Sequence, residues 1–364
     1  MNKNLIDALF WIIWFSLYLI INYLAQKQHP FGEWDAWAIW NLKLKFLLFS
    51  DTPWPDILHN LHKHTHPDYP FLLPCMNTWV YTMSSSHFPF LATMKTSVLF
   101  TMGCAWLLYA GTAQFMRREL AYFISLTILI NPYFMFLSTS QYADIILAFY
   151  LLAALITLIL TIRYQEARMA FLFGCILGLM TFLKNEGLVM AILLILLSGL
   201  YAIVKKAPQE KFNLKVFKNI LIGFIIFTSA TIYFKLFMAP ANHDIIPNLA
   251  STKIFHFPID NLITIRNYIF KEIFDKRWCY IWIFTLILTI LGTPKLFYKE
   301  IKIITLFFLI YFSIVILIYM TSSQVSLDWW IKSSLRRIFQ SALPSVLFIL
   351  FYIHWRDKEK KISI

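Results

Sequence analysis

Residues 145–162, IILAFYLLAALITLILTI, form an uncharged apolar run of the length that crosses a lipid bilayer. A transmembrane helix needs roughly 20 apolar residues, with some tolerance for tilt and local thinning. Nine other stretches have a similar character, at about 5–25, 88–115, 120–138, 168–183, 187–204, 219–239, 280–297, 302–320 and 338–354. The sequence therefore predicts an all-α polytopic membrane protein with about 10 transmembrane helices.

The composition supports the same class of protein. Of the 364 residues, 59% are hydrophobic and 14% are charged, and the mean hydropathy is +0.65. A soluble domain of this size could not bury so much apolar surface. No Gly/Ser-rich or Pro-rich linker separates a soluble module from the rest of the chain, so we expect no separate soluble domain. We divide the chain into residues 1–204, with a long outer loop at 26–87, and residues 205–364, with outer loops at 240–279 and 321–337.

Basic residues predict the orientation, because cytoplasmic connections are enriched in Lys and Arg. With the amino terminus in the cytoplasm, the inner connections are short and basic, whereas the outer connections are longer and carry both signs of charge. The inner basic residues are Lys3, Arg117, Arg118, Arg163, Arg168, Lys205, Lys206, Lys211, Lys215, Lys218, Lys295, Lys299, Lys302, Arg356, Lys358, Lys360 and Lys361. The net charge of +13 thus follows from topology. Nucleic acid is not an expected partner, because no single face collects the charge.

The first outer loop opens with GEWDAWAIW, residues 32–40. After Asp35, apolar side chains recur at helical spacing, which predicts an amphipathic helix in the outer headgroup layer. These side chains are Trp37, Trp40, Leu44, Leu47 and Leu48. Lys43 lies off this stripe and could either reach lipid headgroups or bind a substrate phosphate. An acidic residue gives an anchoring helix no advantage, so Asp35 is a candidate functional carboxylate.

The same loop contains HPDYP at residues 66–70. Its two prolines would hold Asp68 and Tyr69 in place, although such a turn is also ordinary loop structure. Four histidines of this region could bind zinc, but their spacing fits no compact site, so a metal is possible and not expected. They are His59, His62, His64 and His66.

Three more motifs lie at predicted outer helix ends. Asp144, in QYAD, could be a helix N-cap or a functional carboxylate. Residues 168–183 rise about 24 Å as a helix, less than a ~30 Å bilayer core, so the Lys184-Asn185-Glu186-Gly187 turn should lie slightly below the outer surface. A Lys–Glu pair at that depth either faces a polar cavity or closes the turn as a structural ion pair. Arg336 and Arg337 suit recognition of a phosphate, or alternatively of lipid headgroups.

In their order, these motifs resemble those of polytopic glycosyltransferases of the GT-C fold, including bacterial relatives of protein O-mannosyltransferases and of the aminoarabinose transferase of lipid A. The resemblance covers most of the first part of the chain and returns near residues 326–345. It implies a GT-C-like catalytic module in residues 1–204. It also implies sugar transfer from a polyprenyl-phosphate donor to a glycan, lipid or protein acceptor, at the outer face of the bacterial inner membrane and without a nucleotide cofactor.

The resemblance further implies roles for individual residues. Asp35 and Asp144 carry over as the catalytic acidic residues. The residues that carry over as binding the donor phosphate are Lys184 and Arg336 or Arg337, and from its position in the loop we also expect Lys43 to bind it. From their residue types and positions, we expect that substrate is bound by Glu33, Trp34, Trp37, His66, Asp68, Tyr69, Tyr142, Asn185 and Glu186. Two features depart from the family pattern: Arg336 stands where many relatives have an acidic residue, and the soluble carboxy-terminal domain of larger relatives is not seen.

Two other classes of protein stay open. A transporter or flippase of lipid-linked sugars would also be polytopic, but transporters often show related halves and broken helices near the midplane. An O-antigen ligase or polymerase would use a diphosphate-linked donor and the basic residues of a large, late outer loop. Polar residues here concentrate at outer helix ends. This pattern favours an interfacial enzyme, with a general base for the acceptor and cations for the leaving phosphate.

Overall fold

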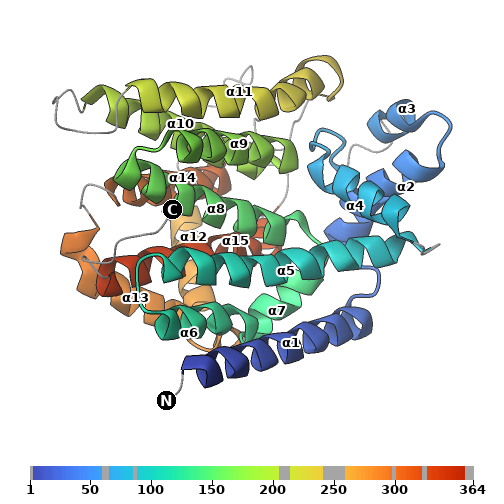
Figure 1. The fold of residues 1–364 in the computed structure, drawn as a ribbon. Coiled ribbons are helices and arrows are strands. Elements are labelled where there is room, and N and C mark those ends of the chain that lie inside the picture. Colours follow the sequence, from blue (N-terminus) through green and yellow to red (C-terminus); the bar gives the residue numbers. More distant parts are fainter. Residues whose placement is uncertain are drawn as a thin grey trace.

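The computed structural model describes residues 3–59, 65–84, 88–204, 214–240, 259–296, 301–321 and 326–356, whose regular structure is helical (Figure 1). In chain order the helices are α1 (Lys3–Gln28), η1 (Ala36–Trp40), α2 (Asn41–Phe49), α3 (Pro53–Leu58), α4 (Leu72–Met83), α5 (Pro89–Ala113), α6 (Arg118–Leu129), α7 (Pro132–Thr139), α8 (Ala143–Tyr164), α9 (Ala167–Leu183), α10 (Asn185–Val204), α11 (Leu214–Phe237), α12 (Ile259–Ile273), η3 (Lys276–Trp278), α13 (Ile281–Gly292), η4 (Thr293–Lys295), α14 (Lys302–Thr321) and α15 (Leu327–Trp355).

Seven of the described helices are long and apolar enough to cross a membrane, and the number rises to nine if each of two bent helix pairs is one span. The protein is therefore a helical, multi-pass membrane protein. The prediction of about 10 spans exceeds this number. The remaining predicted span is α9, which is 17 residues long and rises about 25 Å, short of a ~30 Å bilayer core.

The bent pairs depart from the predicted straight spans. α6 and α7 bend by 62° at Asn131-Pro132, where proline cannot continue the hydrogen-bond ladder and the Asn131 side chain caps α7 by accepting from Phe134 N. The second pair, which includes α12 and α13, bends by 118°. Two predicted outer loops are also partly helical. α12 falls within the 240–279 loop, and α15 begins at Leu327, inside the 321–337 loop.

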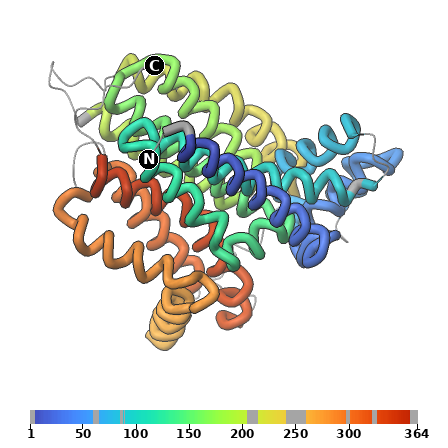
Figure 2. Tube along the Cα trace, turned by 60° about the horizontal axis from the view of Figure 1, so that its bottom comes forward, coloured from blue at the N-terminus to red at the C-terminus, as the bar shows by residue number. Residues whose placement is uncertain are grey.

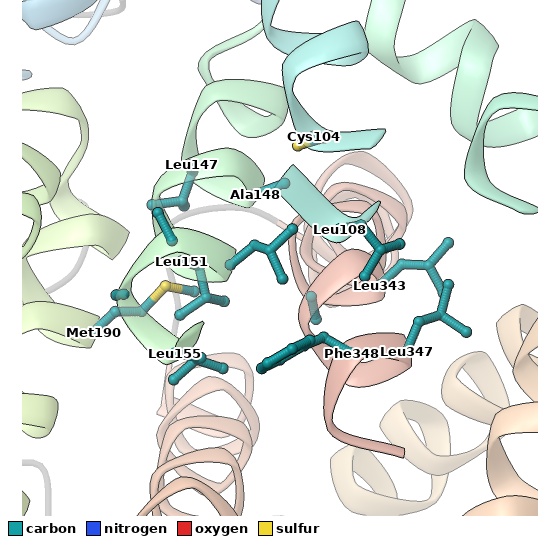
Figure 3. Close-up of a cluster of buried hydrophobic side chains, with 14 of the residues drawn as sticks. Cys104, Leu108, Leu147, Ala148, Leu151, Leu155, Met190, Leu343, Leu347 and Phe348 are labelled. Atoms are coloured by element: carbon teal, nitrogen blue, oxygen red, sulfur yellow. The ribbon is translucent and has the colours of Figure 1, made fainter. Parts of the chain in front are cut away.

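α8 is the central helix of the bundle. In its most apolar window 83% of the residues are buried, against 11% in α1. Figure 3 shows Leu147 and Leu151 of α8 grouped with Leu108 of α5 and Phe348 of α15. Because neighbours pack around it in this way, α8 gives its first turn, which carries Asp144, a fixed place in the fold.

α9 and α11 approach closely through glycines. Gly174 and Gly178 of α9 are spaced four residues apart, and Gly223 lies opposite them on α11. A Cβ on Gly174 would stand 2.0 Å from the Ile220 carbonyl oxygen, and one on Gly223 would stand 2.3 Å from that of Phe171. Small residues at this spacing let membrane helices pack backbone to backbone. The close crossing keeps the carboxy-terminal ends of α9 and α11 side by side.

The predicted first outer loop folds into η1, α2, α3 and α4, which lie together beyond one end of the bundle (Figures 1 and 2). The predicted amphipathic helix is divided between η1 and α2. The apolar side chains of its predicted stripe are partly exposed and partly buried inside the protein. Trp37 is 50% exposed, whereas Trp40 and Leu44 are 1% exposed, and Trp40 stacks on Tyr69. The loop is therefore a packed module, and only part of the predicted stripe is available to lipid.

Candidate functional site

Charged residues from five segments of the chain meet near the end of the bundle that carries α2–α4. Asp35 follows α1, Asp144 lies in the first turn of α8, and Lys184 separates α9 from α10. Lys235 lies in the last turn of α11, and Arg337 lies inside α15. Because consecutive spans run in alternating directions, these positions fall at the same end of the bundle (Figure 1).

Ion pairs among five residues form the centre of the site, and we call these residues (Asp35, Asp144, Lys184, Glu186 and Arg337) the inner cluster. Lys184 Nζ lies 3.1 Å from Asp144 Oδ1 and 3.0 Å from Glu186 Oε1. Arg337 Nη1 pairs with Asp35 Oδ2 and lies 3.9 Å from Asp144 Oδ2. The Asp144 side chain is 6% exposed, that of Asp35 19% and that of Glu186 36%. A ligand would therefore meet Asp35 and Glu186 before Asp144.

The register of α15 against the turn between α7 and α8 positions Arg337. Ser341, one helical turn further on, donates to the backbone carbonyl of Asp144 at 3.2 Å. Gln340 Nε2 donates to Ser138 Oγ at 3.1 Å. Arg337 and Ser341 share one face of the helix, so the same residue, Asp144, contacts α15 through its side chain and through its backbone.

Arg336 does not belong to the inner cluster, although the sequence predicts that it binds phosphate together with Arg337. Neighbouring positions on an α-helix are rotated by about 100° from one another, so the two guanidinium groups diverge. Arg336 lies within electrostatic range of Tyr133 and Glu272. Arg337 alone of the two faces the carboxylates of the inner cluster.

Gly32 sets the path of the segment that carries Asp35. Its φ is +77°, and a Cβ at this position would stand 2.9 Å from the carbonyl oxygen of Ser140. The next residue, Glu33, donates from its backbone N to the same carbonyl at 3.0 Å. Its side chain pairs with His29 Nε2 at 3.1 Å. Glu33, predicted to bind substrate, therefore anchors the loop in this structure.

Gln141, for which no role is predicted from the sequence, is a second anchor. Its φ is +62°, a left-handed conformation that costs a non-glycine residue about 1–2 kcal/mol. Its Nε2 donates to the His29 carbonyl at 2.8 Å, and its Oε1 accepts from Thr93 Oγ1 at 2.6 Å. The buried amide thus ties the end of α1 and helix α5 to the turn before Asp144.

A second group of polar residues, the outer cluster, consists of Asp68, Asn185 and Lys235. Asn185 Nδ2 donates to Asp68 Oδ2 at 2.9 Å. Lys235 Nζ donates to Asn185 Oδ1 at 2.8 Å and to the Asp68 carbonyl at 2.7 Å. Sequence reasoning missed Lys235, and the signal available was a lysine in the last turn of an otherwise apolar helix. Since Asn185 lies between Lys184 and Glu186, the two clusters are adjacent.

Lys43 lies inside the protein, where it cannot contact a donor phosphate as predicted. It is 2% exposed, and its Nζ donates to the backbone carbonyls of His66 at 2.9 Å and Tyr69 at 2.7 Å. Burial lowers the pKa of Lys43 to about 7, an effect that the Asp68 carboxylate opposes. Lys43 therefore clamps the HPDYP turn and thereby places Asp68 against Asn185.

Aromatic residues flank Asp35 in the chain, and another lies beside its partner Arg337. Trp34 and Trp37 are 62% and 50% exposed and meet edge to face at 4.4 Å between ring centroids. The Arg337 guanidinium lies over the ring of Tyr142 at 5.1 Å. Burial raises the pKa of Tyr142 to about 12, with the Asp35 charge adding to the effect, so the phenol stays protonated. Tyr69 is buried close to Asp68 and Glu186, which raises its pKa as well.

Charge in the inner cluster is unbalanced, because three carboxylates face two cations. The outer cluster and Lys43 add one carboxylate and two amines, which brings the described groups at most to neutrality. Buried charges of this kind are stable only when they are paired. A carboxylate of this group can therefore accept a proton, or one of its cations can bind an anion. Either change alters the net charge of the whole group.

Within the described ranges, no group of three or more His, Cys, Asp or Glu side chains has the geometry of a metal site. Of the four histidines considered above, His62 and His64 fall outside those ranges. The ring of His66 stacks on Tyr69 at 4.7 Å between centroids.

Comparison with known proteins finds no matching protein-family model and no curated protein with significant sequence similarity.

Proposed function

We propose that this protein is a membrane glycosyltransferase with a GT-C-like fold, which moves a sugar from a polyprenyl-phosphate donor to a glycan, lipid or protein acceptor. The observation that carries the proposal is the inner cluster. Two carboxylates, Asp35 and Asp144, lie against two cations, Lys184 and Arg337, and the four residues come from separate segments of the chain. A glycosyl transfer with a general base and a charged leaving group can use such a set of side chains.

Asp35 is the proposed general base. It is the more exposed of the two aspartates and lies between Trp34 and Trp37, whose exposed faces suit a sugar or a prenyl chain. It would take the proton of an acceptor hydroxyl or amine as that group attacks the anomeric carbon, an effect typically worth about 10²–10⁴-fold. Asp144 is the buried partner that holds Lys184 and Arg337 in place.

Lys184 and Arg337 would bind the phosphate of the donor and offset the charge that grows on it as the glycosidic bond breaks. The near-neutral balance of the two clusters together with Lys43 favours a monophosphate-linked donor, which carries one negative charge, over a diphosphate-linked donor. This charge balance therefore favours the proposed function over that of an O-antigen ligase or polymerase. The position of Asp144, Lys184 and Glu186 at helix ends likewise argues against a transporter with a midplane site.

The proposed location is the outer face of the bacterial inner membrane. Asp144 begins α8 and Arg163 lies in its last turn, so the cluster and the basic connection to α9 are at opposite ends of this helix. Basic connections favour the cytoplasmic side. The site would then open toward the periplasm, where undecaprenyl-linked sugars are used.

The test is transfer of labelled sugar by the purified protein in lipid nanodiscs. The donors are undecaprenyl-monophosphate hexoses and pentoses, each compared with the same sugar on undecaprenyl diphosphate, and the acceptors are glycolipid, polysaccharide and protein fractions of the cell envelope. Transfer from a monophosphate donor is expected. Transfer from diphosphate donors alone, or movement of donor across the bilayer without transfer, would contradict the proposal.

A further inference from the structure

The cations proposed to bind the donor phosphate are already occupied by carboxylates of the protein. Arg337 pairs with Asp35, and Lys184 pairs with Asp144 and Glu186. These side chains are largely buried, and buried like charges at short range repel strongly. An incoming phosphate would add a negative charge to a cluster in which carboxylates already outnumber cations. It must therefore replace a carboxylate, because simple addition is unfavourable.

The three carboxylates differ in how easily they can leave. Asp144 belongs to the first turn of the central helix α8, is 6% exposed and has its backbone carbonyl bonded to Ser341. Glu186 is 36% exposed, but its departure frees no cation, because Lys184 keeps Asp144 as a close partner at 3.1 Å. Asp35 lies in the segment between α1 and η1, and its departure leaves Arg337 with only the more distant Asp144, at 3.9 Å. Asp35 is the carboxylate whose departure frees a guanidinium edge.

We infer that the phosphate of the donor takes the place of Asp35 on Arg337, so that the general base is released only when the donor is bound. The inference rests on the proposed function. In the resting protein the Asp35 carboxylate accepts a hydrogen bond from Arg337, so the same oxygen is not free to meet the acceptor group. Once the phosphate occupies Arg337, Asp35 loses this partner and can accept a hydrogen bond from the acceptor instead.

The exchange is consistent with a balanced transfer step. The acceptor oxygen or nitrogen forms a bond to the anomeric carbon, and its proton goes to Asp35. The bond between the anomeric carbon and the phosphate oxygen breaks, and its electron pair stays on the polyprenyl phosphate, which Arg337 and Lys184 hold. Departure of the polyprenyl phosphate then allows Asp35, after it has lost its proton to solvent, to return to Arg337. The donor is therefore expected to bind before the acceptor.

The experiment measures binding of undecaprenyl monophosphate without a sugar, in nanodiscs, to the wild type, to Asp35→Asn and to Asp35→Ala. Removing the competing carboxylate should tighten binding by roughly tenfold or more, since a hydrogen bond to a charged group is involved. The double variant Asp35→Asn/Arg337→Gln should lose this gain. Asp7→Asn, which disturbs an ion pair with Arg118 between α1 and α6, is the control and should bind like the wild type.

The outcomes separate the inference from the function on which it rests. If the wild type binds the lipid phosphate and both Asp35 variants bind it equally well or more weakly, the exchange is refuted while the proposed function stands. If neither the wild type nor any variant binds undecaprenyl monophosphate, the proposed function fails and the inference fails with it.

Discussion

Arg337 and Asp35 lie 302 positions apart in the chain and form an ion pair in the folded protein. The pair joins the last long helix to the loop that follows the first one. Its formation requires α15, the turn between α7 and α8, and the Gly32 segment to meet in one register. The inner cluster is thus a product of the whole bundle, so that packing changes far from it should affect activity.

The glycine contact between α9 and α11 provides one such prediction. Gly174→Ala would place a Cβ against a backbone carbonyl of α11, which cannot move without separating the helices. We expect a loss of about 1–3 kcal/mol in unfolding free energy and lower sugar transfer. Unfolding in mixed micelles measures the first effect. Gly103→Ala is the control, because its Cβ would meet only the edge of the Phe149 ring at 3.3 Å; equal stability of the two variants would contradict the role of Gly174.

Lys43 makes stability depend on pH. Its pKa is about 7 in the folded protein and is ordinarily 10.5, so between these values the unfolded chain binds more protons than the folded one. Stability should therefore rise as the pH increases from about 7 toward 10. The variant Lys43→Met should lack this part of the rise, whereas Lys45→Met, at an exposed position, should retain it. Parallel pH profiles for wild type and Lys43→Met would refute the assignment.

Lys184 should be needed for both folding and activity, and two variants separate these needs. Lys184→Met leaves the buried Asp144 carboxylate without its closest cation and should cost about 3–5 kcal/mol of unfolding free energy. Lys184→Met/Asp144→Leu removes the pair together and should recover much of that loss. Neither variant should transfer sugar. A fully active double variant would show that the pair is only structural.

The orientation can be tested by cysteine labelling in intact cells, in a background with Cys75→Ser and Cys279→Ser, since both are exposed free thiols. A membrane-impermeant maleimide should react with a cysteine at Trp79, which is 65% exposed on α4. A cysteine at Arg168, exposed at the start of α9, should react only after permeabilisation. The reverse pattern would invert the proposed topology.

Much of the site could be predicted because the ends of the apolar helices can be recognised in the sequence. Asp35, Asp144 and Lys184 each adjoin an apolar run, and alternation of direction assigns them to one end of the bundle. Which of Arg336 and Arg337 faces the inner cluster could not be predicted, because it depends on how α15, which begins at Leu327, is rotated against its neighbours. The number of apolar residues in a predicted span does not show which side chains of the helix face the cluster.

Tertiary packing accounts for the other differences. The sequence predicts that Lys43 faces headgroups or substrate, because it lies off the apolar stripe of its helix. In the folded protein the HPDYP turn lies against it and supplies two carbonyl acceptors. Lys235 lies within the predicted span 219–239, and its role depends on the glycine contact that brings α11 beside α9. The bend at Asn131-Pro132 was predictable in principle, since proline interrupts a helix.

The most direct measurement is the turnover number for sugar transfer from undecaprenyl monophosphate donors by wild type, Asp35→Asn, Asp144→Asn and the control Asp7→Asn. Loss of a general base should lower turnover by about 10²–10⁴-fold in Asp35→Asn, and Asp144→Asn should also fall strongly because Lys184 and Arg337 lose their common partner. Asp7→Asn should turn over like the wild type. Wild-type turnover in both Asp35→Asn and Asp144→Asn would contradict the account.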